Sequence, residues 1–151
     1  MMKIRRILPP LNLFVLCIAG MTLLRFFYPV AVIFPFPYNY LGLLPLLAGI
    51  FVAVKGVRHI LAARTNLAPF READTLITDG IYRHTRNPIY LGLALALVGV
   101  WVLHRSVAGA LGVMVFVVIA DLWYIRYEEQ MLREKFGHAY EDYRRRTRRW
   151  I

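Results

Sequence analysis

Four long apolar stretches are the feature that most constrains how this chain can fold. They centre on residues 11–24, 40–54, 89–103 and 107–120, and none of these ranges contains a charged side chain. A helix of about 20 apolar residues crosses the hydrocarbon layer of a bilayer. Because 59% of the 151 residues are hydrophobic and only 19% are charged, these stretches are expected to cross a membrane instead of forming the core of a soluble domain.

The basic residues orient these stretches. Lys and Arg lie in the first six residues, between residues 55 and 86, and from residue 126 onward, whereas the opposite connections hold little besides Arg25 and Arg105. Because cytoplasmic segments are enriched in Lys and Arg, both termini are predicted to be cytoplasmic. The predicted spans lie at about 11–28, 40–63, 88–103 and 107–127. The short link between the last two predicts an antiparallel hairpin, and we expect a multi-pass protein of a bacterial or archaeal cytoplasmic membrane.

The segment after the fourth span is predicted to be one amphipathic helix at about 128–147. Leu132, Phe136, Tyr140 and Tyr143 recur there at three- and four-residue spacing, which is typical of one helix face. The arginines between residues 144 and 149 are expected to face anionic lipid headgroups. The whole chain, residues 1–151, is therefore predicted to be a single all-α membrane domain with about four transmembrane helices and a cytosolic amphipathic helix.

Charge and histidine patterns argue against two other kinds of partner. The basic residues gather at segment ends and not in a stripe with exposed aromatic side chains, so nucleic acid is not expected to bind. No metal site is predicted, because Cys17 stands alone and the four histidines show no HExxH or related spacing. The bilayer itself is the expected partner of the basic surface.

The sequence DGIYRHTRNPIYLG, residues 79–92, joins a basic loop directly to the third apolar stretch. The Asn87 side chain is predicted to cap the helix and Pro88 to take its first position, because proline lacks the N–H that would be unpaired there. Unpaired N–H groups and the positive end of the helix dipole suit an anionic ligand group. The alternative is a plain helix start, at which nearby Tyr and Arg side chains anchor the protein to the membrane surface.

Three side chains near the end of the fourth span are predicted to share one helix face. Asp121, Tyr124 and Glu128 are three and four residues apart, and an ionisable group inside an apolar span is a functional candidate. The hairpin is expected to bring Glu128 and Glu129 beside the start of the third span, where carboxylates and helix N–H groups together suit an amino-acid group. The alternative is plain ion pairing of these glutamates with a nearby arginine: Arg83, Arg86 or Arg126.

Together these motifs resemble a known family. TLITDGIYRHTRNPIYLG, then a helical hairpin, then Glu-Glu followed by LxxxFGxxYxxYxxR is similar to the integral-membrane methyltransferases that include isoprenylcysteine carboxyl methyltransferases and phospholipid N-methyltransferases. The resemblance covers residues 74–151 and implies a cytosol-facing pocket for S-adenosylmethionine. The residues that it assigns to this cofactor are Asp74, Thr75, Leu76, Ile77, Tyr82, Asn87, Pro88, Ile89, Tyr90, Glu128 and Glu129.

The resemblance also implies a lipophilic methyl acceptor, either an isoprenylcysteine-type carboxylate or the amine of a lipid headgroup. Tyr124 and Arg126 are expected on the acceptor side. Because a sulfonium methyl is already activated, the protein mainly has to position the reactants. Glu128 or Asp121 is expected to take the proton of an amine, whereas a carboxylate needs no base. Asn-Pro at 87–88, where isoprenylcysteine methyltransferases have His-Pro, is closer to the phospholipid methyltransferases, and the acceptor stays open.

Two other classes of function stay open at this point. Sterol reductases that use NADPH resemble the C-terminal pattern and have their own Arg-His-Pro and FGxxYxxY segments. A non-catalytic membrane module, anchored by its basic helix, is the third alternative. It leaves Asp121, and the approach of Glu128 to Asn87, without a reason.

Overall fold

The computed structural model describes residues 9–28, 31–63 and 74–151, and its regular secondary structure there is helical. The longer helices are α2 (Pro10–Phe27), α3 (Leu43–Ala62), α4 (Pro88–His104), α5 (Ala110–Ile119), α6 (Arg126–Phe136) and α7 (His138–Arg146). Shorter turns of helix are η1 (Tyr38–Gly42), η2 (Gly80–Arg83), η3 (Val107–Gly109) and the π-helical η4 (Ala120–Ile125). The predicted all-α class is confirmed.

Three continuous helical stretches among the described residues are long and apolar enough to cross a membrane: Pro10–Phe27, Tyr38–Ala62 and Val107–Phe136. The 17 residues of α4 form a shorter apolar helix. At about 1.5 Å per residue, α4 is a few ångströms shorter than the hydrocarbon layer of a typical bilayer. These helices make the chain an integral membrane protein and confirm the predicted polytopic fold.

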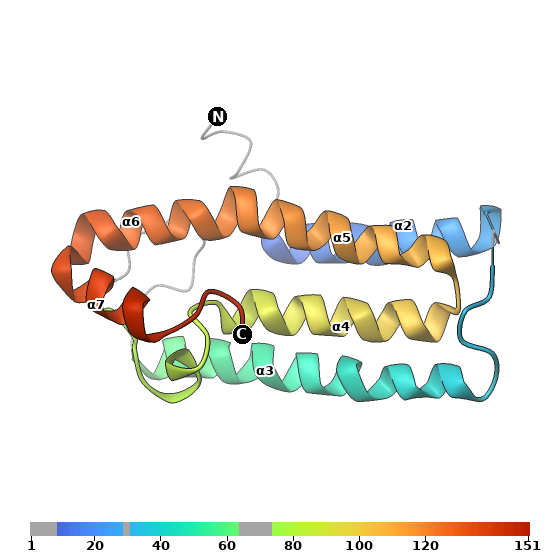
Figure 1. The fold of residues 1–151 in the computed structure, drawn as a ribbon, viewed down its shortest axis with the longest axis horizontal. Coiled ribbons are helices and arrows are strands. Elements are labelled where there is room, and N and C mark those ends of the chain that lie inside the picture. The colour runs from blue at the N-terminus through green and yellow to red at the C-terminus, as the bar shows by residue number, and fades with distance from the viewer. Residues whose placement is uncertain (1–8, 29–30, 64–73) are drawn as a thin grey trace.

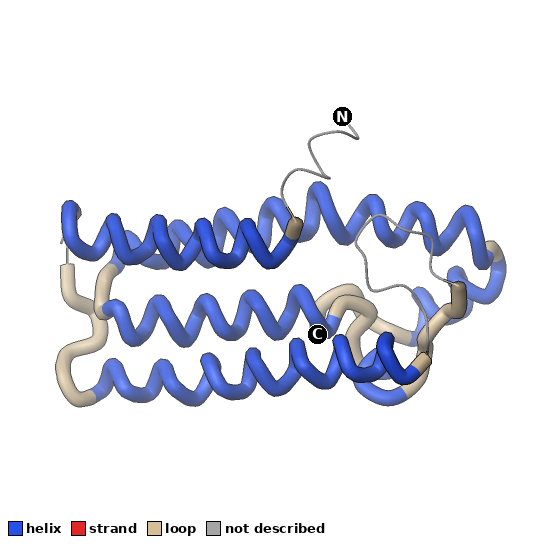
Figure 2. The backbone as a smooth tube through the Cα atoms, turned by 180° about the vertical axis from the view of Figure 1, so that it is seen from behind, coloured by secondary structure: helices blue, strands red, loops and turns tan. Residues whose placement is uncertain are grey.

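Helix α4 occupies the middle of the bundle. Figure 1 shows α3 along one side of α4, and α2 together with α5 along the other side, with the helices running nearly parallel to one another. The view from behind in Figure 2 shows the same layers. Helix α4, which begins at Pro88 directly after Asn87, thus has packing neighbours on both sides.

Glycines bring α3 and α4 into backbone contact. A Cβ atom on Gly92 would lie 2.5 Å from the backbone nitrogen of Ala53, and one on Gly99 would lie 2.5 Å from that of Leu46. Real Cβ atoms never approach this closely, so any side chain at these positions would push the two helices apart. Small residues at such crossings are typical of helix packing in membranes, where close van der Waals contact stabilises the pair.

The opposite side of α4 is packed by large side chains. Met21 of α2, Leu97 of α4 and Phe116 of α5 are completely buried where the three helices meet. Phe14 meets Phe116 edge to face, with ring centroids 6.3 Å apart. Tight interdigitation of this kind fixes the distance between helices and so holds α5 firmly beside α4.

The turn between α4 and α5 confirms the predicted hairpin. Arg105 ends α4 in the left-handed conformation, with φ of 59°, and donates its backbone N–H to Val102. The Arg105 side chain donates to the carbonyl of Phe34, 3.1 Å away, in the link between α2 and η1. Val32 also forms a bridge with Ser106. The first half of the chain therefore holds the turn of the hairpin.

The C-terminal region differs from the single helix predicted at 128–147. Helix α5 continues through η4 into α6, so one rod runs from Val107 to Phe136. Gly137, with φ of 51° and ψ of −121°, then breaks the helix, and α7 starts at His138. Glycine adopts this conformation at little cost because it has no Cβ atom. The prediction of one helix used only the spacing of the apolar side chains, which continues across Gly137. Figure 1 shows that α7 turns back beneath α6 toward α4.

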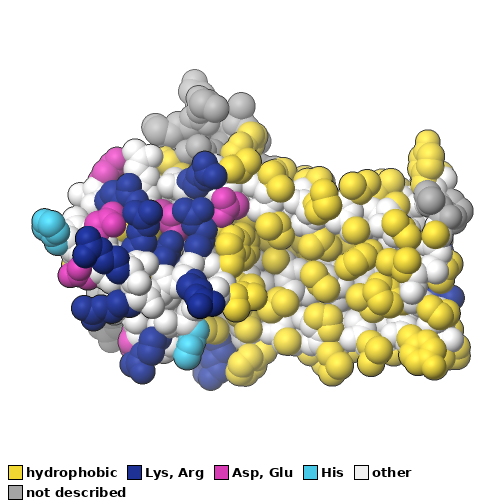
Figure 3. Space-filling view, viewed as in Figure 1, with side chains coloured by type: hydrophobic (Ala, Val, Ile, Leu, Met, Phe, Trp, Pro, Cys, Tyr) yellow, Lys and Arg dark blue, Asp and Glu magenta, His cyan; other side chains and the backbone are white. Residues whose placement is uncertain are grey.

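The surface divides into an apolar body and a charged end. In Figure 3, hydrophobic side chains cover the part formed by the long helices, and Lys, Arg, Asp and Glu gather over α6, α7 and the end of the chain. Exposed apolar residues include Leu16, Leu47, Phe51, Leu111 and Val118. Because such a large apolar surface is unfavourable in water, it is the part expected to face lipid, and the charged end the part that faces an aqueous side.

Candidate functional site

The charged end is built by the docking of the last residues onto the loop before α4. We call residues Thr147–Ile151 the C-terminal segment. Its Arg148 forms a parallel bridge with Thr85, and the Arg148 carbonyl accepts a hydrogen bond from the backbone N–H of Arg86, 2.9 Å away. The Tyr143 hydroxyl, in α7, donates to the carbonyl of Tyr82 at 2.7 Å. The chain end thus lies against the start of α4, as Figure 1 shows.

Arg86, Asp121, Glu129 and Arg149 form a group that we call the arginine cluster. Glu129 accepts hydrogen bonds from Arg86 at 2.9 Å and from Arg149 at 2.6 Å. Arg149 also donates to Asp121 at 3.2 Å, and Trp150 donates its indole N–H to the same carboxylate at 3.2 Å. The side chains of Arg86 and Glu129 are each only 8% exposed. Glu129 thus has two guanidinium partners at a shielded position, and its paired hydrogen bonds with Arg149 have the bidentate geometry that is strongest between arginine and a carboxylate.

The arginine cluster bears on two predictions. The ion pair between Glu129 and Arg86, which the sequence offered as the alternative to a ligand site, is present. Arg149, in contrast, was expected to face lipid headgroups, and its side chain instead points inward to Glu129. Arg149 Nε and Nη2 donate to the two oxygens of Glu129, and the planar fork of a guanidinium group matches a carboxylate in this bidentate way.

Tyr82, Tyr90, Tyr124 and Glu128 form a second group, the tyrosine cluster. The Tyr90 hydroxyl donates to Glu128 Oε1 at 2.7 Å, and the Tyr90 and Tyr124 rings are stacked with centroids 6.1 Å apart. Burial raises the pKa of Tyr82 above its ordinary value, and the nearby Glu128 charge raises that pKa further. Tyr82 is thus a neutral phenol close to the Glu128 carboxylate. The predicted approach of Glu128 to the start of α4 is confirmed.

The contacts separate Asp121 from Tyr124 and Glu128, although their spacing predicted one shared face. Asp121 lies with the arginine cluster, whereas Tyr124 and Glu128 lie with Tyr90. All of η4, which holds Asp121 and Tyr124, is π-helical. A π turn holds more residues than an α turn and shifts the phase of the helix, so counting with the α-helical period is wrong across it.

The predicted capping of α4 by the Asn87 side chain is wrong. Asn87 stands immediately before α4, but its side chain makes no capping hydrogen bond. Its side-chain amide donates instead to the carbonyl of Arg149, 3.0 Å away. Pro88 takes the first helical position as predicted. The first turn of α4 therefore has backbone N–H groups that its own N-cap side chain does not use, beside the tyrosine cluster.

A histidine and an aspartate flank this site at the end of α3. His59 Nε2 lies 3.0 Å from Asp79 Oδ1, and the His59 ring packs against Gly80, whose φ is 55°. The hydrogen bond from His59 lowers the pKa of the exposed Asp79 carboxyl. Glycine at position 80 serves both the positive φ and this close approach. The dyad ties α3 to the loop that carries Tyr82.

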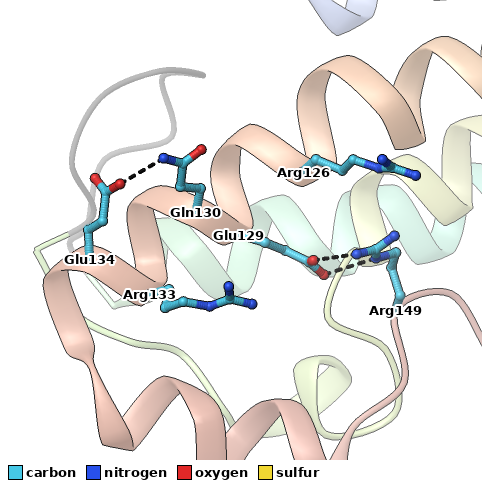
Figure 4. A pocket seen from close by; sticks show the side chains of 6 residues that line it. All are labelled: Arg126, Glu129, Gln130, Arg133, Glu134 and Arg149. Atoms are coloured by element: carbon cyan, nitrogen blue, oxygen red, sulfur yellow. Dashed lines mark hydrogen bonds and ion pairs between the residues drawn. The ribbon is translucent and has the colours of Figure 1, made fainter.

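A groove of about 450 Å³ opens beside the arginine cluster. Figure 4 shows its lining, with the Arg149 side chain reaching across from the C-terminal segment to Glu129 on α6. The lining residues are Arg126, Glu129, Gln130, Arg133, Glu134 and Arg149. Arg126, predicted on the acceptor side, lies here, 3.7 Å from Asp121. Leu122 and Trp123, one turn before it, are exposed apolar residues, so the groove adjoins the lipid-facing surface.

The remaining predicted cofactor residues lie in the connection before η2 and at the start of α4. Asp74 and Thr75 are exposed, and Leu76 and Ile77 are half-buried. Ile89 is half-buried and lies near Gly56 of α3, with Pro88 beside it. Within the described ranges, no group of three or more His, Cys, Asp and Glu side chains could hold a metal ion.

Sequence reasoning missed Arg149 and Trp150 as parts of the site. Both belong to the very end of the chain, where a basic run suggested a solvated surface. The available signal was Trp150 itself, because a large aromatic residue after a basic run is expected to be anchored. Trp150 packs against the buried core cluster, of which Tyr90 and Tyr124 are members.

Long apolar helices with a charged end define a polytopic membrane protein. The chain belongs to the phospholipid methyltransferase family, which it matches over residues 37–139. Members of this family are membrane methyltransferases that use S-adenosylmethionine. This family is the first of the three classes that the sequence left open.

Relatives of the chain agree with this assignment. Over 115 residues, 70% of the chain, it is 28% identical to probable protein-S-isoprenylcysteine O-methyltransferases of Oryza sativa subspecies indica and japonica. The match covers 56% of each rice protein, so the chain spans about half the length of these relatives. A stretch of 64 residues, 42% of the chain, is 38% identical to an uncharacterized protein of Haemophilus influenzae over that protein's whole length. No solved structure matches the chain significantly.

Proposed function

We propose that the protein transfers a methyl group from S-adenosylmethionine to a lipophilic acceptor at the cytoplasmic face of the membrane. The observation that carries the proposal is the hydrogen bond from the Tyr90 hydroxyl to Glu128, 2.7 Å long. It joins the start of α4 to the Glu-Glu pair, the two segments on which the family resemblance rests. S-adenosylmethionine supplies a methyl group that its sulfonium has already activated.

The residues of the tyrosine cluster fit the chemistry of this cofactor. Glu128 has one hydrogen-bond partner within the described ranges, the Tyr90 hydroxyl on Oε1, so Oε2 can accept from an ammonium group. The uncapped N–H groups at the start of α4 suit a carboxylate. The faces of Tyr82, Tyr90 and Tyr124 suit a sulfonium, which aromatic rings attract by cation–π interaction.

The residues outside this cluster support it in different ways. Asn87, Pro88 and Ile89 set the position of the first turn of α4, and residues 74–77 precede η2 in the connection that leads to it. Glu129 completes the pocket wall through its pairs with Arg86 and Arg149. Arginine leaves Glu129 little capacity to bind a ligand ammonium, which leaves Glu128 as the carboxylate that does so.

A base is needed only where the acceptor is an amine. Glu128 and Asp121 are the two carboxylates proposed to take its proton. Where the acceptor is a carboxylate, no base is needed, and the residues act by positioning alone.

The acceptor is proposed to be a molecule whose apolar tail stays in the bilayer. Exposed Leu122 and Trp123 lead from the lipid-facing surface to Arg126 and the groove. Each buried methylene of such a tail contributes about 0.8 kcal/mol, so the membrane concentrates the acceptor at this entrance. Arg126 then meets the polar head of the acceptor, and Tyr124 lies on the inner side.

Calorimetry with the detergent-purified protein tests the cofactor. Binding of S-adenosylmethionine and S-adenosylhomocysteine, without binding of NADPH, is expected. Methyl transfer from labelled S-adenosylmethionine to matched short-chain and long-chain acceptors, with amine or carboxylate heads, then tests the acceptor. Transfer that favours water-soluble acceptors would contradict the membrane-side entrance, and binding of NADPH alone would contradict the proposed reaction.

A further inference from the structure

We infer that Arg149 is a positioning residue of the cofactor site, and that the C-terminal segment is a working part of this site and not a surface anchor. The inference rests on the proposed function and adds a residue that the family motifs do not include. Its basis is that Arg149 uses both its side chain and its main chain to hold residues on either side of the site.

The side chain of Arg149 controls the charge of the arginine cluster. It donates through Nη2 to Glu129 Oε2 at 2.6 Å, through Nε to Glu129 Oε1 at 3.1 Å, and through Nη1 to Asp121 at 3.2 Å. Without it, Glu129 would keep only Arg86 and Asp121 only Arg126, 3.7 Å away, so the cluster would gain a net negative charge. Glu129 is adjacent to Glu128 in the chain, so that charge would act directly beside the proposed ligand-binding carboxylate.

The main chain of Arg149 sets the orientation of Asn87. Its carbonyl accepts from Asn87 Nδ2 at 3.0 Å and from the Thr85 hydroxyl at 3.2 Å. Because a carbonyl only accepts, the nitrogen of the Asn87 amide must face Arg149 and the oxygen must face away. The same contact keeps the Asn87 side chain from capping α4, which leaves the first N–H groups of this helix to a ligand.

Neighbouring residues hold Arg149 in place from both sides. Arg148 bridges to Thr85, and the Arg86 side chain donates to the carbonyl of Thr147. On the other side, Trp150 donates to Asp121 at 3.2 Å and packs against the buried core cluster, of which Tyr124 is a member. A residue fixed before and after itself loses little further entropy on binding a ligand, which is the condition for a positioning role.

Arg148 offers a matched control, because it is adjacent and has the same side chain but a different environment. The Arg148 side chain is exposed and donates to the carbonyl of Ile151 at 3.5 Å. Its contribution to the site comes from its backbone, which a substitution by alanine retains. A role of basic charge in general would make the two arginines equivalent, whereas a positioning role makes them different.

The test compares Arg149→Ala, Arg149→Lys and Arg148→Ala in the full chain, with any purification tag kept away from the C-terminus. Calorimetry with S-adenosylhomocysteine gives the Kd, steady-state transfer gives KM and kcat, and thermal unfolding in detergent reports folding. We expect Arg149→Ala to raise the Kd about tenfold or more, with KM for S-adenosylmethionine rising more than kcat falls. Arg149→Lys is expected to restore part of the affinity, and added guanidinium ion to restore part of it to Arg149→Ala. Arg148→Ala should bind as the wild type does.

Three results would overturn the inference. The first is an Arg149→Ala protein that binds as tightly as the wild type, and the second is an equal loss in Arg148→Ala. The third is a loss that neither lysine nor guanidinium restores and that follows a fall in melting temperature, which would show a role in folding alone. A wild-type protein that binds neither S-adenosylmethionine nor S-adenosylhomocysteine would overturn the proposed function itself. This outcome differs from the other three because it is seen in the wild type and does not depend on any variant.

Discussion

The arginine cluster and the tyrosine cluster each surround one of two consecutive glutamates, yet the surroundings differ in kind. Glu129 is held by two guanidinium groups, with the shortest hydrogen bond at 2.6 Å. Glu128 is held, within the described ranges, by one neutral hydroxyl at 2.7 Å. A carboxylate that is already neutralised by arginine serves the fold, whereas one that keeps unused acceptor capacity can serve a ligand. Adjacent residues of the same type can therefore have opposite roles.

The largest effect should come from breaking the arginine cluster. Arg86→Ala leaves Glu129, which is 8% exposed, without one of its two cations and is expected to lower the free energy of unfolding by about 3 to 5 kcal/mol. Thermal or chemical unfolding in detergent measures this loss. Arg133→Ala is the control, because its pair with Glu141 is 50% exposed on the arginine side. Similar losses in the two variants would mean that the cluster is no more than surface charge.

The second prediction separates the two glutamates directly. Glu128→Gln keeps the shape of the side chain but removes its charge, and should weaken S-adenosylmethionine binding by about 1 to 3 kcal/mol with little change in unfolding. Glu129→Gln should instead clearly lower the free energy of unfolding and should change S-adenosylmethionine binding less. Calorimetry and thermal unfolding on both proteins give the comparison. If both variants changed binding and stability in the same proportion, the distinction between the clusters would be lost.

A smaller effect is expected from the hydroxyl that holds Glu128. Tyr90→Phe removes only the hydrogen bond to Oε1 and should weaken cofactor binding by about 0.5 to 1.5 kcal/mol. Tyr40→Phe, at an exposed position near the start of the second span, is the control for the chemical change. Unchanged affinity in the Tyr90 variant would show that Glu128 is oriented by its backbone alone.

The smallest effect on stability should come from the rim of the groove. The Arg126 side chain is 59% exposed and 3.7 Å from Asp121, so Arg126→Ala should change the free energy of unfolding by about 1 kcal/mol or less. The KM for a long-chain acceptor should nevertheless rise, because this side chain lies at the proposed entrance. A stability loss as large as that of Arg86→Ala would place Arg126 inside the cluster and not at its rim.

Much of the frame of this site was predictable from the sequence because it depends on local patterns. Uncharged stretches predicted the membrane helices, and the short link before Val107 predicted the hairpin that carries Glu128 back to Tyr90. Glycines seven residues apart, at 42, 49 and 56 and again at 92 and 99, were also visible in the sequence. Their meaning became clear only when α3 and α4 were seen in backbone contact.

Errors arose where a local pattern was overridden by a distant partner or by a turn of the backbone. The type of residue at Asn87 predicted a cap, but the carbonyl of Arg149, 62 positions away, takes its amide. The spacing of Leu132, Phe136, Tyr140 and Tyr143 predicted one helix, but Gly137 interrupts it. Periodicity reports what a segment favours alone, and a tertiary hydrogen bond or a turn can override it.

The sequence by itself determined that this is an all-α membrane protein of the phospholipid methyltransferase family, because hydropathy, charge placement and motif order are written locally along the chain. Only the tertiary structure decided which glutamate is neutralised and which remains able to bind a ligand. The difference between the two glutamates depends on the position of the C-terminal segment. This segment contacts Thr85, Asn87 and Glu129, which are distant from it in the sequence, so no local pattern predicts these contacts. Side-chain type sets what a carboxylate can do, and the partners that the fold brings to it decide what it does.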